Sequence, residues 1–436
     1  MNSSTPITER RYVVPFILVT SLFFLWAIGV NLNDILIPHL KKAFSLTDFQ
    51  SSLIQSAFFG GYFLAALPAG WLMQRLGYKK GILIGLCICA TGALLFIPAA
   101  SVRLYGFFLF ALFVMACGQC FLEVAANPYV TILGPPESAE RRLNFAQSFN
   151  SVGAVVTPFL GAAFILSGIE HTPAELGAMT PAQLLAYRTS EADMVKVPYL
   201  VISGVFLCVA LLIYFSELPE VRESSKPDGV ATRMPLSGIW PHTHLIKGVF
   251  AQFLYVGAQV GVASFIIRFA EHSIPGTHEK DAARYLQMHM VGFMVGRFAG
   301  SVIMKKVTAP RLLSLFATGA VICLLIALLG SGQVPVWAVV LLGLFHSIMF
   351  PTIFALSLKD LGAYTKLGSS LLVMSIVGGA IVPALMGRIS DAATIQVAFV
   401  VPLVCHAYIL YFAIRGYKPV TVAPTNPLLS VTNEVE

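Results

Sequence analysis

Charged residues are scarce in this sequence, because Asp, Glu, Lys and Arg together make up only 11% of its 436 residues. Soluble domains carry about 25% charged residues, so this chain lacks the side chains that would wet the surface of one. A disordered chain needs high charge and low hydrophobicity, and 57% of these residues are hydrophobic. The composition therefore leaves a membrane protein.

The alternation of apolar and polar residues that marks a transmembrane β-barrel is also missing. Long apolar runs recur instead, and at roughly 20 residues per crossing they predict an all-α membrane protein with twelve transmembrane helices. The predicted spans lie near residues 12–38, 50–74, 81–100, 104–133, 143–168, 196–216, 245–270, 283–304, 311–330, 335–358, 367–388 and 394–414.

The loops between these spans lack cysteine, since all seven cysteines fall inside apolar segments. We therefore expect no disulfide framework. Cys117 and Cys120 have the spacing of a redox or zinc motif, but no second ligand pair accompanies them. Walker, GxSxG and HExxH motifs are absent from the sequence. We expect no catalytic residue, no metal and no cofactor, and predict that the protein is not an enzyme.

Polar stretches inside the chain are few, and the longest, residues 217–244, has the composition of a linker. It divides the chain into an N-terminal six-helix bundle (1–216) and a C-terminal six-helix bundle with a short tail (245–436). Ala69–Gly70 before Arg75 is echoed by Ala299–Gly300 before Lys305, which indicates a parallel repeat of the two bundles. In the second long loop, Thr180 is expected to cap a short helix over residues 182–187.

Basic residues are distributed unevenly between the two sides of the predicted membrane. Of 28 Lys and Arg residues, eighteen lie at the termini and in the loops on their side, and eight lie on the opposite side. The positive-inside rule then places both termini in the cytoplasm. The same distribution explains the net charge of +7 without a nucleic-acid partner. Only Arg268 and Arg297 fall within predicted spans.

Acidic residues are almost absent from the spans, because only Asp34 and Glu123 of the 21 acids lie inside them. A charge at the bilayer centre costs at least ~2.5–3.5 kcal/mol, so such residues are functional candidates by default. The alternative is a buried ion pair, yet the first half of the chain offers no intramembrane base. A carboxyl that is neutral when buried and ionised when wetted can carry a proton, which makes Asp34 and Glu123 candidates for proton coupling.

Amide side chains recur on several predicted spans, and Gln119, Glu123 and Asn127 share one face of the fourth. Amides both donate and accept hydrogen bonds, so they suit a ligand rich in hydroxyl groups. Their structural alternative is a role as contacts between helices. His346 could carry a proton or line a pore. The predicted substrate-binding residues are Asn31, Glu123, Asn127, Gln147, Asn150, Gln252, Tyr255, Gln259, His346 and Phe350.

Eight segments resemble the fucose–proton symporter family of the major facilitator superfamily. They are residues 31–38 (NLNDILIP), 55–62 (QSAFFGGY), 67–70 (LPAG), 122–128 (LEVAANP), 144–150 (NFAQSFN), 255–259 (YVGAQ), 296–298 (GRF) and 351–354 (PTIF). The resemblance covers nearly the whole chain. It implies the major facilitator fold and proton-driven uptake of a hexose or 6-deoxyhexose, of the L-fucose or glucose/galactose type, by alternating access across the bacterial inner membrane.

In that family the aspartate of the first span and the glutamate of the fourth serve proton coupling and sugar recognition, and they match Asp34 and Glu123. The matched Asn31, Gln147, Asn150 and Gln259 are candidates for contacts with sugar hydroxyls. The sequence departs from the pattern at Gln74, where the superfamily usually has aspartate. It also departs at Ala263, where the fucose transporters have an aromatic residue, whereas Phe350 keeps the second aromatic position.

We therefore predict a monomeric symporter for a monosaccharide and a proton in a lipid membrane, with Asp34 as the main proton site and Glu123 coupled to sugar binding. Sodium coupling stays open, because Asp34 and Asn31 could ligate a cation through oxygen atoms. Proton-coupled efflux of amphipathic compounds and a membrane-embedded enzyme acting on lipid also stay open. The sequence leaves the natural sugar undecided among glucose, galactose, fucose, mannose and N-acetylated hexosamines.

Overall fold

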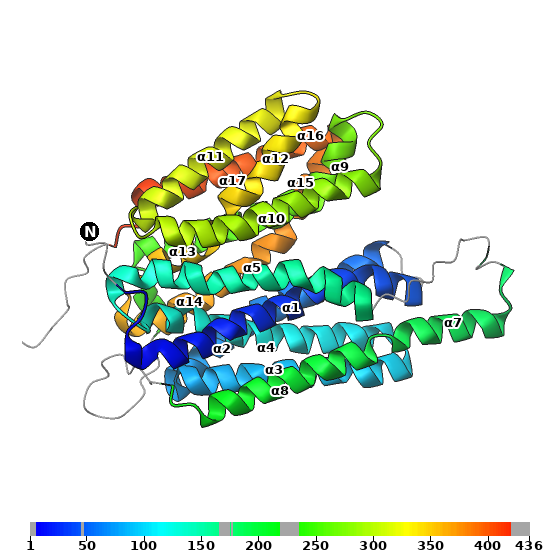
Figure 1. The fold of residues 1–436 in the computed structure, drawn as a ribbon, viewed down its shortest axis with the longest axis horizontal. Coiled ribbons are helices and arrows are strands. Elements are labelled where there is room, and N and C mark those ends of the chain that lie inside the picture. Colours follow the sequence, from blue (N-terminus) through cyan, green and yellow to red (C-terminus); the bar gives the residue numbers. More distant parts are fainter. Residues whose placement is uncertain (1–5, 45–47, 165–174, 176–177, 219–234, 420–436) are drawn as a thin grey trace, which may run out of the picture.

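The protein is described here from a computed structural model that covers residues 6–44, 48–164, 175, 178–218 and 235–419. Within these ranges the side chains of residues 33–39, 41–43, 48–49, 51–52, 158–164, 191–192 and 279–280 are not described. The described chain consists of helices and loops without a β-strand, as the all-α prediction requires. Figure 1 shows the helices in two groups that lie one above the other and diverge towards one end.

The first group contains the helices before residue 219. These are α1 (Val13–Phe44), α2 (Asp48–Leu76), α3 (Tyr78–Val102), α4 (Tyr105–Ile132), α5 (Ala139–Phe164), α7 (Pro181–Asp193) and α8 (Lys196–Phe215). The second group contains α9 (Thr243–Ser273), α10 (Glu279–Ile303), α11 (Ala309–Leu329), α12 (Gln333–His346), α13 (Met349–Leu358), α14 (Thr365–Met374), α15 (Gly378–Ala392), α16 (Ile395–Ala398) and α17 (Val400–Tyr411). The predicted linker lies largely outside the described residues.

Ten helical stretches of the described chain are long and apolar enough to cross a membrane. Helices α5 and α10 supply the other two predicted spans, and their 26 and 25 residues make them long enough. They are less apolar because they carry polar residues such as Gln147, Asn150 and Arg297. The twelve predicted spans therefore each correspond to a helix or to a broken helix.

Two of the spans are broken near their middle. The tenth span is interrupted at Ser347 and Ile348, between α12 and α13, and the eleventh at the short 3-10 turn Ser375–Val377. A break inside a membrane frees backbone carbonyls that need new donors. The Tyr255 hydroxyl donates to the carbonyl of His346 over 2.9 Å, and Arg297 Nε donates to that of Ser347 over 3.0 Å. The break therefore places polar backbone beside Arg297.

The two groups touch at the end that holds the N-terminus, which we call the terminal end (left in Figure 1). There Gly70 of α2 lies so close to α14 that a Cβ atom would overlap the side chain of Ser370. The Asn144 amide donates to the Thr352 hydroxyl over 3.1 Å, and the Ser369 hydroxyl donates to the Val124 carbonyl over 2.8 Å. Small residues and cross-group hydrogen bonds thus close this part of the interface.

Arg142, near the start of α5, anchors the loop that precedes its helix. Its side chain is fully buried and donates to the carbonyls of Val130, Thr131 and Gly134 at the end of α4, among others. A cation near a helix C-terminus is favoured by the unsatisfied carbonyls there. Arg142 also donates to the carbonyl of Ile7, over 3.0 Å. It therefore ties α4, α5 and the N-terminal segment of the first group together.

The predicted capped helix in the loop before α8 is present and longer than expected. Helix α7 runs over Pro181–Asp193, where residues 182–187 were predicted. The Thr180 hydroxyl accepts from the Gln183 backbone N–H over 3.3 Å, as an N-cap should. Figure 1 shows α7 projecting beyond the other helices at the end opposite the terminal end, which we call the α7 end.

Candidate functional site

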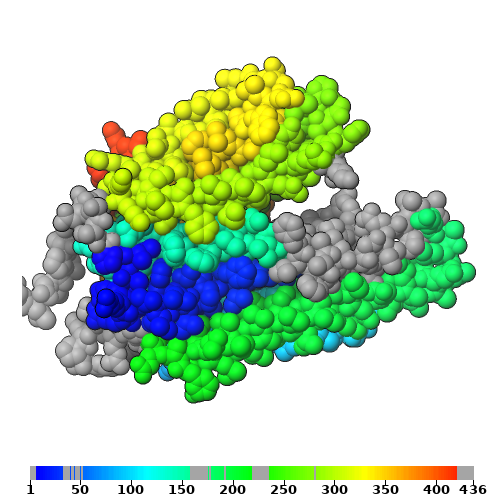
Figure 2. Space-filling view, in the orientation of Figure 1, coloured from blue at the N-terminus to red at the C-terminus, as the bar shows by residue number. Residues whose placement is uncertain are grey.

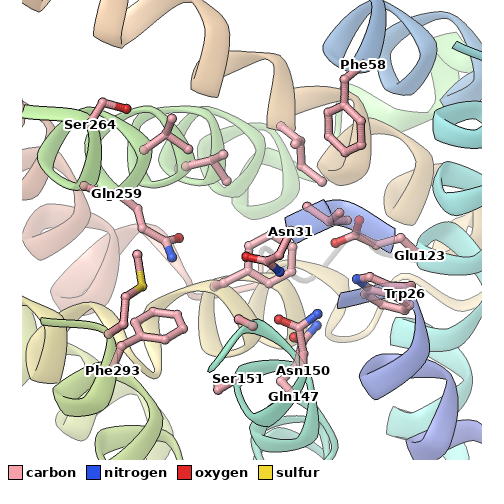
Figure 3. Close-up of a pocket in the computed structure, with 18 of the residues that line it drawn as sticks. Trp26, Asn31, Phe58, Glu123, Gln147, Asn150, Ser151, Gln259, Ser264 and Phe293 are labelled. Atoms are coloured by element: carbon pink, nitrogen blue, oxygen red, sulfur yellow. The ribbon is translucent and has the colours of Figure 1, made fainter. Parts of the chain in front are cut away.

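A cavity of about 500 Å³ lies between the two groups of helices (Figure 3). Its walls come from α1, α2, α4 and α5 on one side and from α9, α10, α13 and the 3-10 turn after α14 on the other. The lining residues are Trp26, Val30, Asn31, Gln55, Phe58, Phe59, Tyr62, Glu123, Gln147, Asn150, Ser151, Ala154, Val155, Val256, Gln259, Val260, Ala263, Ser264, Leu286, Met290, Phe293, Arg297, Phe350 and Ile376. Both groups therefore contribute to one site.

Glu123 supplies the acidic group of the first-group wall. Its side chain is only 6% exposed, and Figure 3 shows it beside Trp26 and close to Asn31. The Tyr62 hydroxyl and the Asn127 amide lie near its carboxyl. Glu123 is thus the one carboxyl that the described part of the chain presents to this cavity.

Arg297 supplies the basic group, from α10 of the second group. It is 4% exposed and donates through Nη1 to the side-chain oxygen of Gln147 over 3.1 Å and to the Gln147 carbonyl. Its guanidinium carbon also lies 4.5 Å from the ring centre of Phe293. Because Gln147 belongs to α5, these hydrogen bonds cross between the two groups. Arg297 is also electrostatically coupled to Glu123.

A polar network runs from Arg297 to the backbone of Glu123. The Gln147 amide donates to the side-chain oxygen of Asn127 over 2.9 Å, and the Asn127 amide donates to the Glu123 carbonyl over 3.1 Å. Buried polar networks are costly to leave half satisfied, so a change at one member is felt by the others. Arg297 is therefore connected through hydrogen bonds to the backbone turn of α4 that carries Glu123, and it interacts with the Glu123 carboxyl through space.

Aromatic rings form much of the remaining lining and come from both groups. Phe58, Phe59 and Tyr62 belong to α2, whereas Phe293 and Phe350 come from α10 and α13. In Figure 3 the labelled Phe58 and Phe293 lie on opposite sides of the space between the amide side chains. A few polar groups set among apolar and aromatic walls are typical of a small-molecule site. This combination suits a ring compound whose hydroxyl groups bind the polar side chains and whose C–H groups pack against the aromatic rings.

Six of the predicted site residues line the cavity, namely Asn31, Glu123, Gln147, Asn150, Gln259 and Phe350. Asn31 and Asn150 donate to the carbonyls of Ala27 and Phe23, which leaves their side-chain oxygens available to a ligand. The side chain of Asp34 lies outside the described residues, although α1 contains its backbone. The predicted role of Asp34 therefore stays a prediction.

Four predicted site residues are buried away from the cavity lining: Asn127, Gln252, Tyr255 and His346. Asn127 lies behind Gln147, to which it is hydrogen-bonded. Tyr255 binds the backbone of the broken tenth span. The His346 ring stacks on that of His406 at 4.9 Å, in the interior of the second group. In this conformation these residues pack behind the residues that line the cavity and do not face the cavity themselves.

Sequence reasoning missed Arg297 as a site residue, along with the aromatic residues Trp26, Tyr62 and Phe293. The sequence marks Arg297 as intramembrane, but places it in the half of the chain that does not contain Glu123. The signal was the intramembrane charge itself, which is rarely present without a function. Arg268, the other intramembrane base, is exposed and lies over the ring of Phe265 at 5.2 Å.

The sequence matches the profile of the Major Facilitator Superfamily over residues 19–383. It is 44% identical over 417 residues to a glucose/galactose transporter of Brucella abortus, covering 94% of this chain and 96% of that protein. It is 45% identical over 409 residues to the L-fucose-proton symporter of Escherichia coli, covering 93% of each. A crystal structure of the superfamily transporter FucP in the outward conformation superposes with a TM-score of 0.86 at 45% identity, covering 93% of this chain and 99% of that one. The chain belongs to the Major Facilitator Superfamily.

Proposed function

We propose that this protein is a secondary active symporter that takes up a hexose or 6-deoxyhexose together with a proton by alternating access. The observation that carries the proposal is the buried Glu123 in a cavity shared by both groups, opposite Arg297 and surrounded by amides and aromatic rings. Relatives of 44% and 45% identity that are named as glucose/galactose and L-fucose-proton transporters support the substrate class. The protein acts as a monomer in a lipid bilayer.

In this proposal the terminal end faces the cytoplasm of a bacterial inner membrane. The excess of Lys and Arg at the termini and in the loops on their side supports this orientation. The first bundle comprises residues 1–216, the cytoplasmic linker residues 217–244, and the second bundle residues 245–436. The cross-group contacts of Gly70 and Asn144 then close the cytoplasmic side, and the cavity is reached from outside.

The sugar binds between the two groups, with its hydroxyl groups on the amides. Asn31, Gln147 and Asn150 supply the first-group side, and Gln259 supplies the second. The apolar C–H face of the ring lies against Phe293 or Phe350. Because contacts come from both groups, bound sugar favours a conformation in which the groups approach each other. Sugar binding thereby biases the equilibrium between the two access states.

Proton coupling works through the charge of Glu123. When the carboxylate is ionised it attracts Arg297, whose hydrogen bonds to Gln147 hold the two groups together. Protonation of Glu123 removes that attraction and lets the groups separate at the terminal end with sugar bound. Release of sugar and proton inward restores the charge. Asp34 takes up the proton first in this scheme and passes its effect to Glu123.

Uptake into proteoliposomes tests the proposal directly. With an inward proton gradient, labelled hexoses and 6-deoxyhexoses are presented in parallel, and at least one is expected to accumulate above equilibrium. Collapse of the gradient with a protonophore should abolish that accumulation. A sodium gradient of equal size that drives uptake at constant pH would instead support sodium coupling. Failure of every sugar in the panel, with export of an amphipathic cation, would contradict the proposal.

Glu123→Gln is expected to separate transport from its driving force. The amide keeps the size and hydrogen-bonding capacity of the carboxyl but cannot change charge. Accumulation driven by the proton gradient should fall to background, whereas exchange of internal for external sugar should persist. Glu271→Gln, at the far end of α9, is the matched control and should leave both unchanged. Continued proton-driven accumulation of sugar by Glu123→Gln would contradict the scheme.

A further inference from the structure

A second cavity, of about 690 Å³, lies at the terminal end between the two groups. The first group contributes the start of α5 and the turn before it, and the second group contributes the α10–α11 connection, the end of α13 and Tyr417. The lining residues are Pro136, Glu137, Glu140, Arg141, Met304, Lys306, Val307, Thr308, Ala309, Pro310, Arg311, Leu356, Lys359 and Tyr417. None of them lines the central cavity.

The charges around this cavity are predominantly positive. Arg141 comes from the first group, and Lys306, Arg311 and Lys359 come from the second, against only two acids, Glu137 and Glu140. Glu140 is electrostatically coupled to Lys359, so part of the positive charge is balanced across the interface. The cavity still carries two more cations than anions. Like charges that face one another across an interface oppose its closure.

A helix N-terminus adds to this positive field. Helix α11 begins at Ala309, and its N-cap residue Thr308 makes no side-chain hydrogen bond to the first turn. The backbone N–H groups of a first turn lack partners within their helix and favour an anion. Since Pro310 has no N–H, the donors in this first turn are those of Ala309 and Arg311. Thr308, Ala309 and Arg311 all line the cavity. The N–H groups and the basic side chains therefore act on the same space.

The cavity lies one helical turn from the polar contact that closes the terminal end. Asn144 follows Glu140 by one turn of α5, and Thr352 precedes Leu356 by one turn of α13. The Asn144 amide donates to the Thr352 hydroxyl over 3.1 Å. The positive-inside rule explains why basic residues gather at this end. It does not explain why four of them converge on one cavity that exists only while the two groups touch.

We propose that this cavity binds a phosphate group carried on a small polar molecule, and that the bound anion holds the terminal end closed. The anion would replace repulsion between Arg141 and the cations of the second group by attraction to both. The volume of the cavity falls in the range of about 300–1,000 Å³ that small-molecule sites occupy. Since the site is shared by both groups, the ligand binds the closed terminal end better and shifts the equilibrium towards it. Transport would then slow when the phosphate ester is abundant on that side.

Binding can be measured without any transport assay. We would determine the unfolding temperature of the protein in phosphatidylcholine nanodiscs as a function of glucose 6-phosphate, with potassium chloride at equal ionic strength as the reference. The double variant Lys306→Gln, Arg311→Gln is expected to weaken the response roughly tenfold or more, because charge-assisted hydrogen bonds are lost. The matched control is Arg75→Gln, Lys80→Gln, two exposed basic residues at the same end outside the cavity.

A second arm uses nanodiscs that contain phosphatidylglycerol and no glucose 6-phosphate. A rise in unfolding temperature in this arm would identify a lipid headgroup as the source of the phosphate group. In either arm, a rise in the unfolding temperature that is weaker in the Lys306→Gln, Arg311→Gln variant than in the control variant supports the site. Equal responses of all three proteins in both arms would overturn it. The closure step has its own readout, because glucose 6-phosphate should slow thiol labelling of Ser370→Cys, buried between α14 and α2. Binding without slower labelling would refute the closure.

Discussion

At the scale of single residues, the site depends on a division of charge between the two groups. Glu123 belongs to α4 and Arg297 to α10, and their hydrogen-bonded partners Asn127 and Gln147 meet between them. Neither charge has a close ion-pair partner within its own group among the described residues. Each therefore interacts most favourably when the groups are together. The acid that we propose to respond to protons thus lies on the opposite side of the interface from Arg297.

Arg297→Lys tests whether geometry or charge alone matters at this position. Lysine keeps the positive charge but cannot donate to the Ser347 carbonyl and to Gln147 at the same time as the planar guanidinium does. At least one charge-assisted hydrogen bond is lost, so sugar accumulation should fall roughly tenfold or more. Arg268→Lys, exposed on α9, should change uptake less than about twofold. Equal effects of the two substitutions on initial uptake rates would contradict this role for Arg297.

The candidate site was only partly predictable from sequence, and individual residues show why. Glu123 could be found because an acid inside an apolar run is rare. The free-energy cost of placing its charge in the bilayer can be recognised from the sequence without knowing which residues surround it. Gln252 was predicted from the recurrence of amide side chains on the spans, yet it is buried and does not line the cavity. Helical periodicity gives the face on which a residue lies, but not which neighbour that face meets. Arg297 needed the three-dimensional arrangement, since its partner is 150 residues away.

At the scale of elements, close contact between α2 and α14 controls how tightly the terminal end can shut. Gly70 provides the room, because any side chain there would overlap Ser370. Gly60, on the same helix, has no neighbouring atom within 4 Å of the Cβ position. These two glycines therefore offer a matched pair, in which the same chemical change meets either a packed helix or open space.

Gly70→Ala should destabilise the closed terminal end, whereas Gly60→Ala should not. Overpacking of a tight contact typically costs about 1–3 kcal/mol, which is enough to shift the two access states by roughly tenfold. The shift can be measured as faster thiol labelling of a cysteine introduced at Lys366, near the start of α14. Ser370→Gly should restore slow labelling when combined with Gly70→Ala. Labelling as fast in Gly60→Ala would show that helix propensity, not the contact, is responsible.

Element positions were predictable because twenty-residue apolar runs have few alternatives in a membrane, and the twelve predicted spans all have helices. The positions at which the tenth and eleventh spans break could not be predicted from the sequence. Pro351 lies in the tenth span, just after its break at Ser347 and Ile348. Pro383 lies inside α15, whereas the eleventh span breaks at Ser375–Val377. Proline removes one hydrogen bond, but the site of a break depends on which donors can satisfy the freed carbonyls.

At the scale of the whole molecule, the two groups meet at one end and enclose the cavity nearer the other. Figure 2 shows the two groups as separate masses at the α7 end, with the second group tilted away from the first. Ser264 of α9, which lines the cavity, is exposed there, whereas Ser370 of α14 is fully buried. Close contact at one end and exposure at the other are what the proposed alternating access requires of a resting state.

Cysteine labelling should report this asymmetry. In a background with the exposed Cys87 and Cys208 replaced by serine, Ser264→Cys should react quickly with a membrane-impermeant maleimide added to intact cells, and Ser370→Cys should not. A transported sugar should slow labelling at Ser264→Cys several-fold. Fast external labelling at Ser370→Cys instead would mean that the orientation proposed for the terminal end is reversed.

Two arginines of the described chain, Arg142 and Arg297, are fully or almost fully buried. They differ in whether their hydrogen-bond acceptors all belong to one group of helices. All the hydrogen-bond acceptors of Arg142 belong to the first group, so its guanidinium is dehydrated once, when that group folds. Arg297 bonds across the interface, so in the proposed cycle it loses its Gln147 acceptor each time the two groups separate there. An unpartnered buried guanidinium is expensive. In the proposed cycle, the time at which water or a new acceptor reaches Arg297 therefore contributes to the kinetic barrier of each turnover.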